Sequence, residues 1–214
     1  MTDYSLKVDN ISKYFGRRLI FKELAFQINN NGILGISGSN GSGKSTLVKI
    51  IAGINSPSSG KVIHSNDNIE IIPEKLHNYL GFVSPYLVLY EEFSALENLQ
   101  YFSKIRGVKF NTEKISLLLE KFLLKGRQDD LVKTYSSGMK QRLKFIFALM
   151  HNPRLIILDE PTSNLDSAGK DVVYQIIEEE SSSNIVIIAS NEESDLLICK
   201  NEIKLEDFKP ALSA

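Results

Sequence analysis

Residues 38–46 read GSNGSGKST, a glycine-rich stretch that indicates the class of fold. It follows a short apolar run, GILGIS (32–37), that is typical of a buried strand, and it opens a helical pattern over 44–52 that ends near Gly53. The pattern G-x-x-x-x-G-K-[ST] is met at Gly38, Gly43, Lys44 and Ser45. Glycines let successive N–H groups point into one concavity, and the helix N-terminus adds partial positive charge, so such a loop binds phosphate oxygens.

The loop therefore predicts a nucleoside triphosphate site. Lys44 is expected to reach the β- and γ-phosphates, and the Ser45 hydroxyl to ligate Mg²⁺. The residues expected to hold the nucleotide here are Gly38, Ser39, Asn40, Gly41, Ser42, Gly43, Lys44, Ser45 and Thr46.

Composition limits the class of protein. With 214 residues, 43% hydrophobic and 24% charged, the chain suits one globular domain over 1–214. A net charge of −1 argues against a nucleic-acid partner. One cysteine, Cys199, suits a reducing cytosol, and the N-terminal residues have no apolar signal region. The longest apolar runs are far shorter than a membrane span, so we expect a soluble, cytoplasmic chain.

Further along the chain, two runs are apolar on both faces, RLIILD (154–159) and NIVIIAS (184–190), as in parallel strands covered by helices. KVDNIS (7–12) and LAFQIN (24–29) alternate, as in strands with one wet face. Helices are expected over 112–124, 137–150 and 167–180, the first N-capped by Thr112. Its apolar stripe comprises Ile115, Leu118, Leu119, Phe122 and Leu123. The pattern predicts an α/β core (1–85 and 151–214) with an inserted helical subdomain (86–150).

Two adjacent carboxylates, Asp159 and Glu160, end the second buried strand. The strand end is expected to place Asp159 near Ser45, where it can hold a water on Mg²⁺. Glu160 would then face the γ-phosphate as general base for an attacking water. The alternative for such a pair is two solvated acids at a strand end.

With YSSGMKQR (135–142), these motifs and their order resemble those of ATP-binding cassette (ABC) ATPases, the nucleotide-binding subunits of ABC transporters. The resemblance extends from ISKYFGRRLIF (11–21) to IIASNEESDL (187–196). It implies an α/β P-loop NTPase core with a mostly parallel sheet, an N-terminal antiparallel β subdomain and an inserted helical subdomain. It also implies ATP and Mg²⁺ as cofactors, a second ATPase subunit and a membrane-spanning partner subunit at the inner face of the cell membrane.

The resemblance also assigns residues. In the family, a signature motif at a helix start binds the γ-phosphate held by the other subunit, which here implies Ser136 and the Gly138 amide. A plain helix N-cap is the alternative for Ser136. The adenine-stacking aromatic would be Phe15, or Tyr14 by one-residue slippage, and Asp166 matches the loop between subunits. YSSGMKQR looks like the version in ABC-2-type and cytochrome c-maturation heme exporters.

Two positions depart from the family pattern. Aligning residues 81–83 puts Pro85 where the family has a glutamine, and proline has no side-chain donor. Asn191 stands where the family has a histidine, and asparagine donates a hydrogen bond but carries no charge. With Glu160 and Asn191 as the catalytic pair, we expect ATP binding and dimer closure with slowed hydrolysis. Tyr86, Leu87 and Phe93 follow on the family's route to its membrane partner, with packing inside the subdomain as the alternative.

The best interpretation is an ATPase subunit that powers an exporter. The alternatives are a soluble ABC ATPase that does not transport, or a slowly hydrolysing nucleotide switch. For the phosphate loop alone, the alternative class is a P-loop kinase or a small GTPase. A GTPase would carry an N-K-x-D motif, and the sequence has none.

Overall fold

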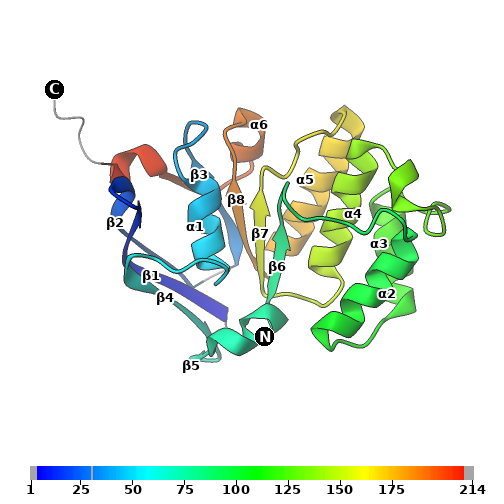
Figure 1. Ribbon diagram of the computed structural model, residues 1–214, viewed down its shortest axis with the longest axis horizontal. Coiled ribbons are helices and arrows are strands. Elements are labelled where there is room, and N and C mark those ends of the chain that lie inside the picture. The colour runs from blue at the N-terminus through cyan, green and yellow to red at the C-terminus, as the bar shows by residue number, and fades with distance from the viewer. Residues whose placement is uncertain (1–3, 30, 210–214) are drawn as a thin grey trace.

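The structure, a computed structural model, describes residues 4–29 and 31–209 as two β-sheets and a group of helices (Figure 1). The antiparallel sheet has the order β2-β1-β4-β5, and the parallel sheet has the order β6-β7-β8-β3-β9. The antiparallel strands are β1 (Tyr4–Phe15), β2 (Arg18–Ile28), β4 (Ser59–Asn66) and β5 (Ile69–Glu70). The parallel strands are β3 (Gly32–Ser37), β6 (Leu80–Val83), β7 (Leu155–Asp159), β8 (Ile185–Ala189) and β9 (Asn201–Lys204). The α-helices are α1 (Lys44–Ile51), α2 (Ala95–Arg106), α3 (Thr112–Lys121), α4 (Ser137–Leu149), α5 (Ser167–Ser181) and α6 (Glu193–Leu196).

The predicted α/β architecture, with an antiparallel sheet formed by the N-terminal part of the chain and a parallel sheet, is confirmed. Short 3-10 helices lie at Pro73–Asn78, Val132–Thr134 and Leu205–Phe208. Helices α2, α3 and α4 gather at the end of the molecule away from the antiparallel sheet (Figure 1). The proposed division of the chain at 85/86 and 150/151 stays a prediction.

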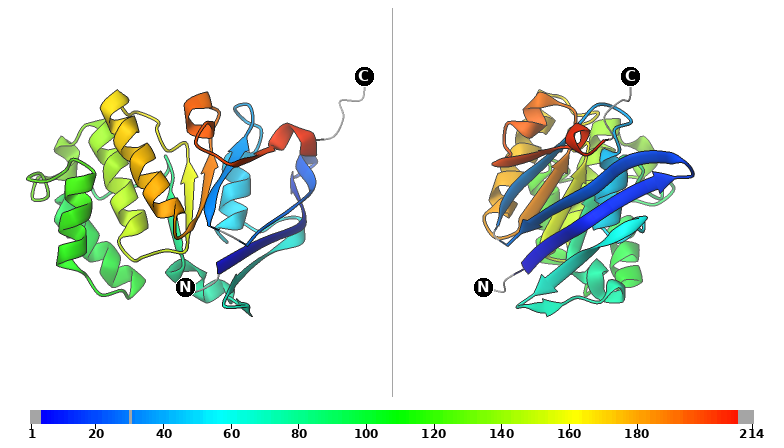
Figure 2. Two further views of the ribbon diagram at one scale, coloured as in Figure 1. Left: turned by 180° about the vertical axis from the view of Figure 1, so that it is seen from behind. Right: turned by 90° about the vertical axis from the view of Figure 1, so that its left-hand side faces the viewer.

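The parallel sheet separates two hydrophobic cores. Every residue of β7 and β8 is buried, and alternate side chains enter opposite cores because successive strand residues point to opposite faces. Leu155 and Ile157 pack with α1 and the antiparallel sheet. Ile156 and Leu158 pack with α4 and α5, which cover the other face (Figure 2). Burial on both faces explains why these strands read as continuous apolar runs.

The parallel register puts the site at one edge of this sheet. β3 pairs with β8 and β8 with β7, so Ile36, Ala189 and Asp159 lie side by side at the carboxyl ends of their strands. Each strand then continues into a loop that the sequence singled out: the glycine loop after β3, Glu160 after β7 and Asn191 after β8. Ligands of open α/β sheets bind at this edge.

Helix α3 differs from its prediction at both ends. Asn111, not Thr112, is the N-cap, because the Asn111 side chain accepts from the Lys114 N–H, and Thr112 is the first helical residue. The helix ends at Lys121, three residues early, where Leu123 takes a left-handed conformation (φ 55°). That turn leaves Leu123 55% exposed while Phe122 and Leu124 stay in the core, so the prediction that Leu123 belongs to the apolar stripe is wrong.

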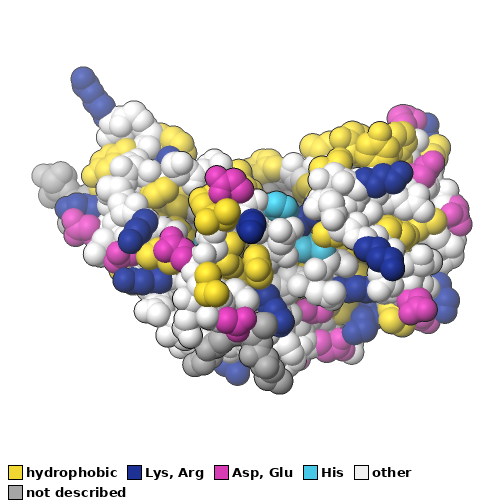
Figure 3. All heavy atoms as spheres, turned by 90° about the horizontal axis from the view of Figure 1, so that it is seen from below, with side chains coloured by type: hydrophobic (Ala, Val, Ile, Leu, Met, Phe, Trp, Pro, Cys, Tyr) yellow, Lys and Arg dark blue, Asp and Glu magenta, His cyan; other side chains and the backbone are white. Residues whose placement is uncertain are grey.

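The face of the molecule that is seen from below carries charged and hydrophobic side chains together. Basic and acidic side chains are scattered among groups of hydrophobic ones, and neither sign of charge dominates the face shown (Figure 3). Among residues 4–29 and 31–209, no helix is long and apolar enough to cross a membrane.

Candidate nucleotide-binding site

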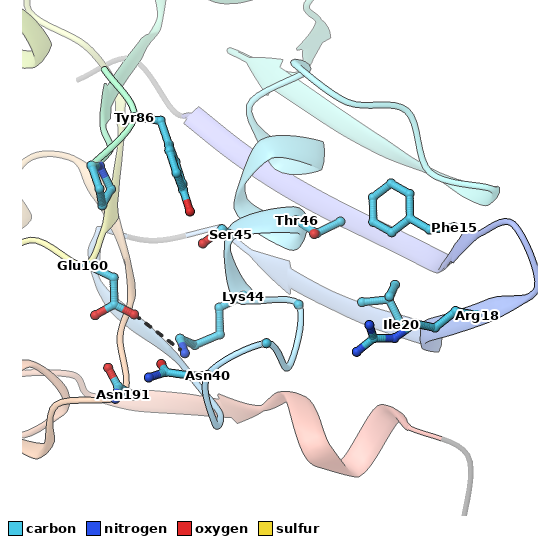
Figure 4. Close-up of a pocket in the computed structure, with 13 residues that line it drawn as sticks. Phe15, Arg18, Ile20, Asn40, Lys44, Ser45, Thr46, Tyr86, Glu160 and Asn191 are labelled. Carbon is cyan, nitrogen blue, oxygen red and sulfur yellow. Dashed lines mark ion pairs between the residues drawn. The ribbon is translucent and has the colours of Figure 1, made fainter. Parts of the chain in front are cut away.

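A pocket of about 640 Å³ lies at the carboxyl edge of the parallel sheet (Figure 4). Segments far apart in the sequence build it: the β1–β2 hairpin, the glycine loop with the start of α1, the turn after β6, and the ends of β7 and β8. Its lining residues are Phe15, Arg18, Ile20, Asn40, Gly41, Gly43, Lys44, Ser45, Thr46, Pro85, Tyr86, Glu160 and Asn191. The pocket thus contains most of the sequence-predicted site.

The glycine loop has the conformation that the motif requires. Gly38, Gly41 and Gly43 have φ of 153°, 78° and 111°, in the region that L side chains avoid. A Cβ on Gly43 would also lie 2.4 Å from Cγ2 of Ile20 on the neighbouring hairpin. Only glycine fits there, so the loop can curl its N–H groups around a phosphate directly before α1 begins at Lys44.

Lys44 lies folded over the loop. Its side chain is buried, and Nζ donates to the Gly38 carbonyl at 2.8 Å. The same Nζ lies 3.7 Å from Oε1 of Glu160 (Figure 4). The ammonium therefore stands between the loop and the acidic strand end, where it can meet phosphate oxygens.

Ser45 and Asp159 meet as predicted: the Ser45 hydroxyl donates to Oδ1 of Asp159 at 2.9 Å. Oδ2 of Asp159 is buried without a hydrogen-bond partner, and the residue is fully buried. Burial raises the pKa of the Asp159 carboxyl, while the Ser45 hydrogen bond and the charges of Lys49 and Lys44 oppose that rise. A hydroxyl beside a carboxylate with a free buried oxygen fits a hydrated Mg²⁺, for which oxygen is the preferred ligand.

Glu160, the residue that follows β7, has an unusual backbone conformation. Its φ is 52°, in the left-handed region, and its N–H donates to the Ala189 carbonyl of β8 at 2.9 Å. Non-glycine residues held there commonly mark functional sites. Burial raises the pKa of the Glu160 carboxyl, and the charge of Lys44 opposes this rise. A carboxylate with a raised pKa is a better proton acceptor for general-base chemistry.

Asn191 lines the pocket from a loop fixed by a buried carboxylate. Asp195, which is 1% exposed, accepts hydrogen bonds from the hydroxyls of Ser190 (2.6 Å), Thr162 (2.8 Å) and Tyr174 (2.7 Å). The segments after β7 and β8 are thereby tied to one group beside Asn191. The sequence interpretation missed Asp195, because nothing in its local pattern shows that three hydroxyls converge on it.

At the other end of the pocket, Phe15 is a lining residue and Tyr14 is not. The ring of Phe15 is half exposed, with Nζ of Lys13 5.0 Å from its centroid. Arg18 and Ile20 also line the pocket and were missed. The pair Arg17–Arg18 beside the Gly16 turn was the available signal for a phosphate-seeking side chain there.

Several predicted residues lie away from this pocket. Ser136 Oγ accepts from the Met139 N–H at 3.2 Å, so Ser136 is the N-cap of α4, the alternative kept open above. Asp166 caps α5 by accepting from Gly169 N–H. Gly138 faces the Asn164 carbonyl, 3.2 Å from where its Cβ would be. These three residues are not among the pocket lining, and their role toward a second subunit stays a prediction.

The first residues of the loop face away from the pocket. Ser39 donates through its N–H (2.7 Å) and its hydroxyl (3.0 Å) to Oε1 of Glu206, in the 3-10 helix near the C-terminus. Neither Ser39 nor Gly38 and Ser42 line the pocket. Ser39 therefore anchors the outer side of the loop in this structure, whereas Asn40, Gly41 and the residues from Gly43 to Thr46 line the pocket itself.

Comparison with known proteins places the chain in a family. Residues 21–163 match the family model of ABC transporters. The ABC transporter ATP-binding protein YdbJ of Bacillus subtilis (strain 168) is 34% identical over 96% of this chain and 70% of the relative. The Nod factor export ATP-binding protein I of Sinorhizobium fredii (strain NBRC 101917 / NGR234) is 31% identical over 81% of this chain and 51% of the relative.

The fold is likewise shared with solved structures. A putative ABC transporter ATP-binding protein from Pyrococcus furiosus superposes with a TM-score of 0.83 at 24% identity, over 96% of this chain and 100% of the other. The chain spans about half to three quarters of the length of the curated relatives that it matches. From the motifs, the site and these matches, the chain belongs to the ABC transporter family of ATP-binding proteins.

Proposed function

We propose that this chain binds and hydrolyses ATP and thereby powers an ABC transporter whose membrane-spanning part is a separate subunit. One observation carries the proposal: the glycine loop, Ser45 and Glu160 line one pocket, and Asp159 accepts a hydrogen bond from the Ser45 hydroxyl. That combination of phosphate cradle, metal ligands and base is what hydrolysis of a nucleoside triphosphate needs.

The residues divide the work of the reaction. The loop N–H groups and Lys44 bind the β- and γ-phosphates, and Phe15 stacks on the adenine. Ser45 and Asp159 would hold Mg²⁺, which when bound supplies positive charge to the phosphates. Glu160 orients a water and accepts its proton. Before ATP binds, the ion pair with Lys44 keeps the Glu160 carboxylate in place, and when ATP binds, the Lys44 ammonium pairs with the phosphates instead.

The remaining predicted residues act between subunits in this proposal. Ser136 and the Gly138 amide, at the positive end of α4, bind the γ-phosphate held by a second ATPase subunit, with Asp166 in the loop between the two. ATP would then close the dimer, and closure would drive the membrane partner.

A cluster of aromatic side chains is the proposed contact for that membrane partner. Rings of Tyr90, Phe93 and Tyr101 lie within 5.7 to 6.5 Å of one another by centroid, and Tyr90 and Tyr101 are more than half exposed. Tyr86 and Leu87 precede them in the chain. Docking there would keep the chain at the cytoplasmic face of the cell membrane. The Nod factor export relative supports export as the direction.

Turnover is proposed to be slow. Pro85 and Asn191 both line the pocket, and neither carries a titratable group.

The test of the proposed function is ATP hydrolysis by the purified chain with Mg²⁺, alongside Glu160→Gln, with the size of each protein measured with and without ATP. Turnover lost in the variant, with an ATP-stabilised dimer, supports the proposal. ATP that neither binds nor is hydrolysed would overturn it.

A further inference from the structure

The turn after β6 brings a tyrosine into the nucleotide pocket. Tyr86 is 71% exposed, yet it lines the pocket, and its hydroxyl end is directed inward on the side of Ser45 (Figure 4). Pro85 lines the pocket as well but offers no side-chain hydrogen bond. The only side-chain hydrogen-bonding group of this turn that lines the pocket is therefore the phenol of Tyr86.

A lysine of α1 fixes the ring of Tyr86. Nζ of Lys49 lies 4.5 Å from the ring centroid, within the range of a cation–π interaction. Lys49 follows Ser45 by four residues in the same helix, so both side chains lie on one face of α1. The interaction therefore favours a position of the tyrosine ring on the side of Ser45, whose hydroxyl is one of the groups that fit a metal ion.

A second lysine fixes the backbone of the same turn. Lys144 of α4 is only 9% exposed, and its Nζ donates to the carbonyls of Ser84 (3.2 Å) and Pro85 (3.0 Å). Among the described residues Lys144 forms no ion pair, and burial lowers the pKa of its ammonium. A buried cation that bonds only to these two carbonyls has one evident role, which is to hold this turn against α4.

We propose that the Tyr86 hydroxyl hydrogen-bonds to the hydrated Mg²⁺ of bound MgATP, and that Lys144 is the positioning residue that holds Tyr86 there. The inference rests on the proposed function, because it requires that the pocket binds MgATP. A phenol oxygen can accept a hydrogen bond from water held on the metal. This pair would supply at residue 86 the polar contact that Pro85 cannot make.

Binding of ATP with Mg²⁺ and with EDTA tests the tyrosine. Titration calorimetry would use Glu160→Gln as the parent, so that ATP is not consumed, and Tyr86→Phe on that background, which keeps the ring over Lys49. We expect the dissociation constant for MgATP to rise about three- to tenfold, the size of one hydrogen bond, and that for metal-free ATP to stay unchanged. Unchanged MgATP affinity, or an equal loss with and without metal, would overturn the assignment.

The lysine is tested through the tyrosine. Lys144→Met should reproduce the metal-dependent loss of Tyr86→Phe, and the double variant should lose no more than either, whereas Lys140→Met on the same helix should match the parent. Losses that multiply in the double variant would show that Lys144 does not act through Tyr86. If the parent binds no MgATP, the proposed function fails together with this inference; if the parent binds it and Tyr86→Phe binds equally, only this inference fails.

Discussion

Lys44 and Glu160 face one another across the pocket, with Nζ of the lysine 3.7 Å from Oε1 of the glutamate. The lysine side chain is buried and the glutamate side chain is 26% exposed, so the pair joins the phosphate loop to the end of β7. In the proposed reaction the lysine ammonium exchanges its ion pair with Glu160 for one with the phosphates, and this leaves the carboxylate free to accept a proton from water.

Glu160→Gln should therefore abolish turnover but preserve ATP binding. The amide keeps the size of the side chain and removes the proton acceptor, which commonly lowers the rate by a factor of about 10² to 10⁴. Phosphate release and ATP affinity would be measured in parallel. Glu179→Gln on α5, an exposed glutamate that pairs with Lys121, is the matched control and should behave like the wild type. A Glu160→Gln variant with wild-type turnover would exclude Glu160 as the base.

Asn191→His should raise turnover. The residue lines the pocket from a loop that Asp195 already fixes, so a histidine would be presented from a prepared position. It would add a group that can carry positive charge near pH 7, and we expect a gain of about tenfold that declines as the histidine loses its proton. The measurement is the turnover rate from pH 6 to 9 beside Asn191→Ala. Equal rates for the histidine variant and the wild type at every pH would show that Asn191 does not limit the rate of ATP turnover.

The centre of the site could be predicted because short-range patterns specify it. A glycine loop between a buried strand and a helix has few alternatives, and the parallel register then brings Asp159 to Ser45 without further information. The apolar runs of β7 and β8 were equally readable, since each is buried on both faces.

What the sequence did not reveal depends on long-range contacts. Arg18 and Ile20 reach the pocket only because the β1–β2 hairpin folds over the glycine loop. Tyr86 was interpreted as a partner contact, and its place in the pocket depends on Lys49 and Lys144 from two different helices. β9 was missed because it is only four residues long and is defined by its pairing with β3. Asn111 and not Thr112 is the N-cap of α3, and the sequence did not distinguish them because both neighbours have side chains that can cap a helix.

Removal of either proposed metal ligand should make ATP binding insensitive to Mg²⁺. Asp159→Asn removes the charge from a carboxylate that is fully buried and has one free oxygen, and Ser45→Ala removes the hydroxyl bonded to it. We expect each variant to bind MgATP at least about tenfold more weakly than the wild type, and metal-free ATP with similar affinity. Titration of ATP with Mg²⁺ or EDTA provides both values for each protein. A variant that still gains affinity from Mg²⁺ would place the metal elsewhere.

Acid should destabilise the fold through His64 of β4, a buried residue of the antiparallel sheet. The ring is 5% exposed and bonded on both sides: Nε2–H donates to the Ile51 carbonyl at 2.9 Å, and Nδ1 accepts from the Tyr4 hydroxyl at 2.7 Å. A carbonyl can only accept, so the neutral ring carries its proton on Nε2 and leaves Nδ1 to accept from the Tyr4 hydroxyl. Burial lowers the pKa of His64 to about 4 from an ordinary value of 6.5, against a smaller opposing effect of the Ile51 hydrogen bond.

The unfolded chain takes up this proton at a higher pH than the folded chain. The contribution of His64 to the free energy of unfolding should therefore be complete above pH 6.5 and be lost as the pH drops toward 4. The expected loss from this one group is about 3 kcal/mol. His64→Gln can keep both hydrogen bonds and cannot titrate, so its unfolding free energy should fall less steeply between pH 6.5 and 4. Urea unfolding across this range, with the exposed His77→Gln as control, measures the difference. The pKa of His151 is also lowered to about 4 by burial, but His151 is present in both proteins and contributes equally to both slopes. Equal slopes for the wild type and His64→Gln would therefore mean that His64 does not take up a proton on unfolding.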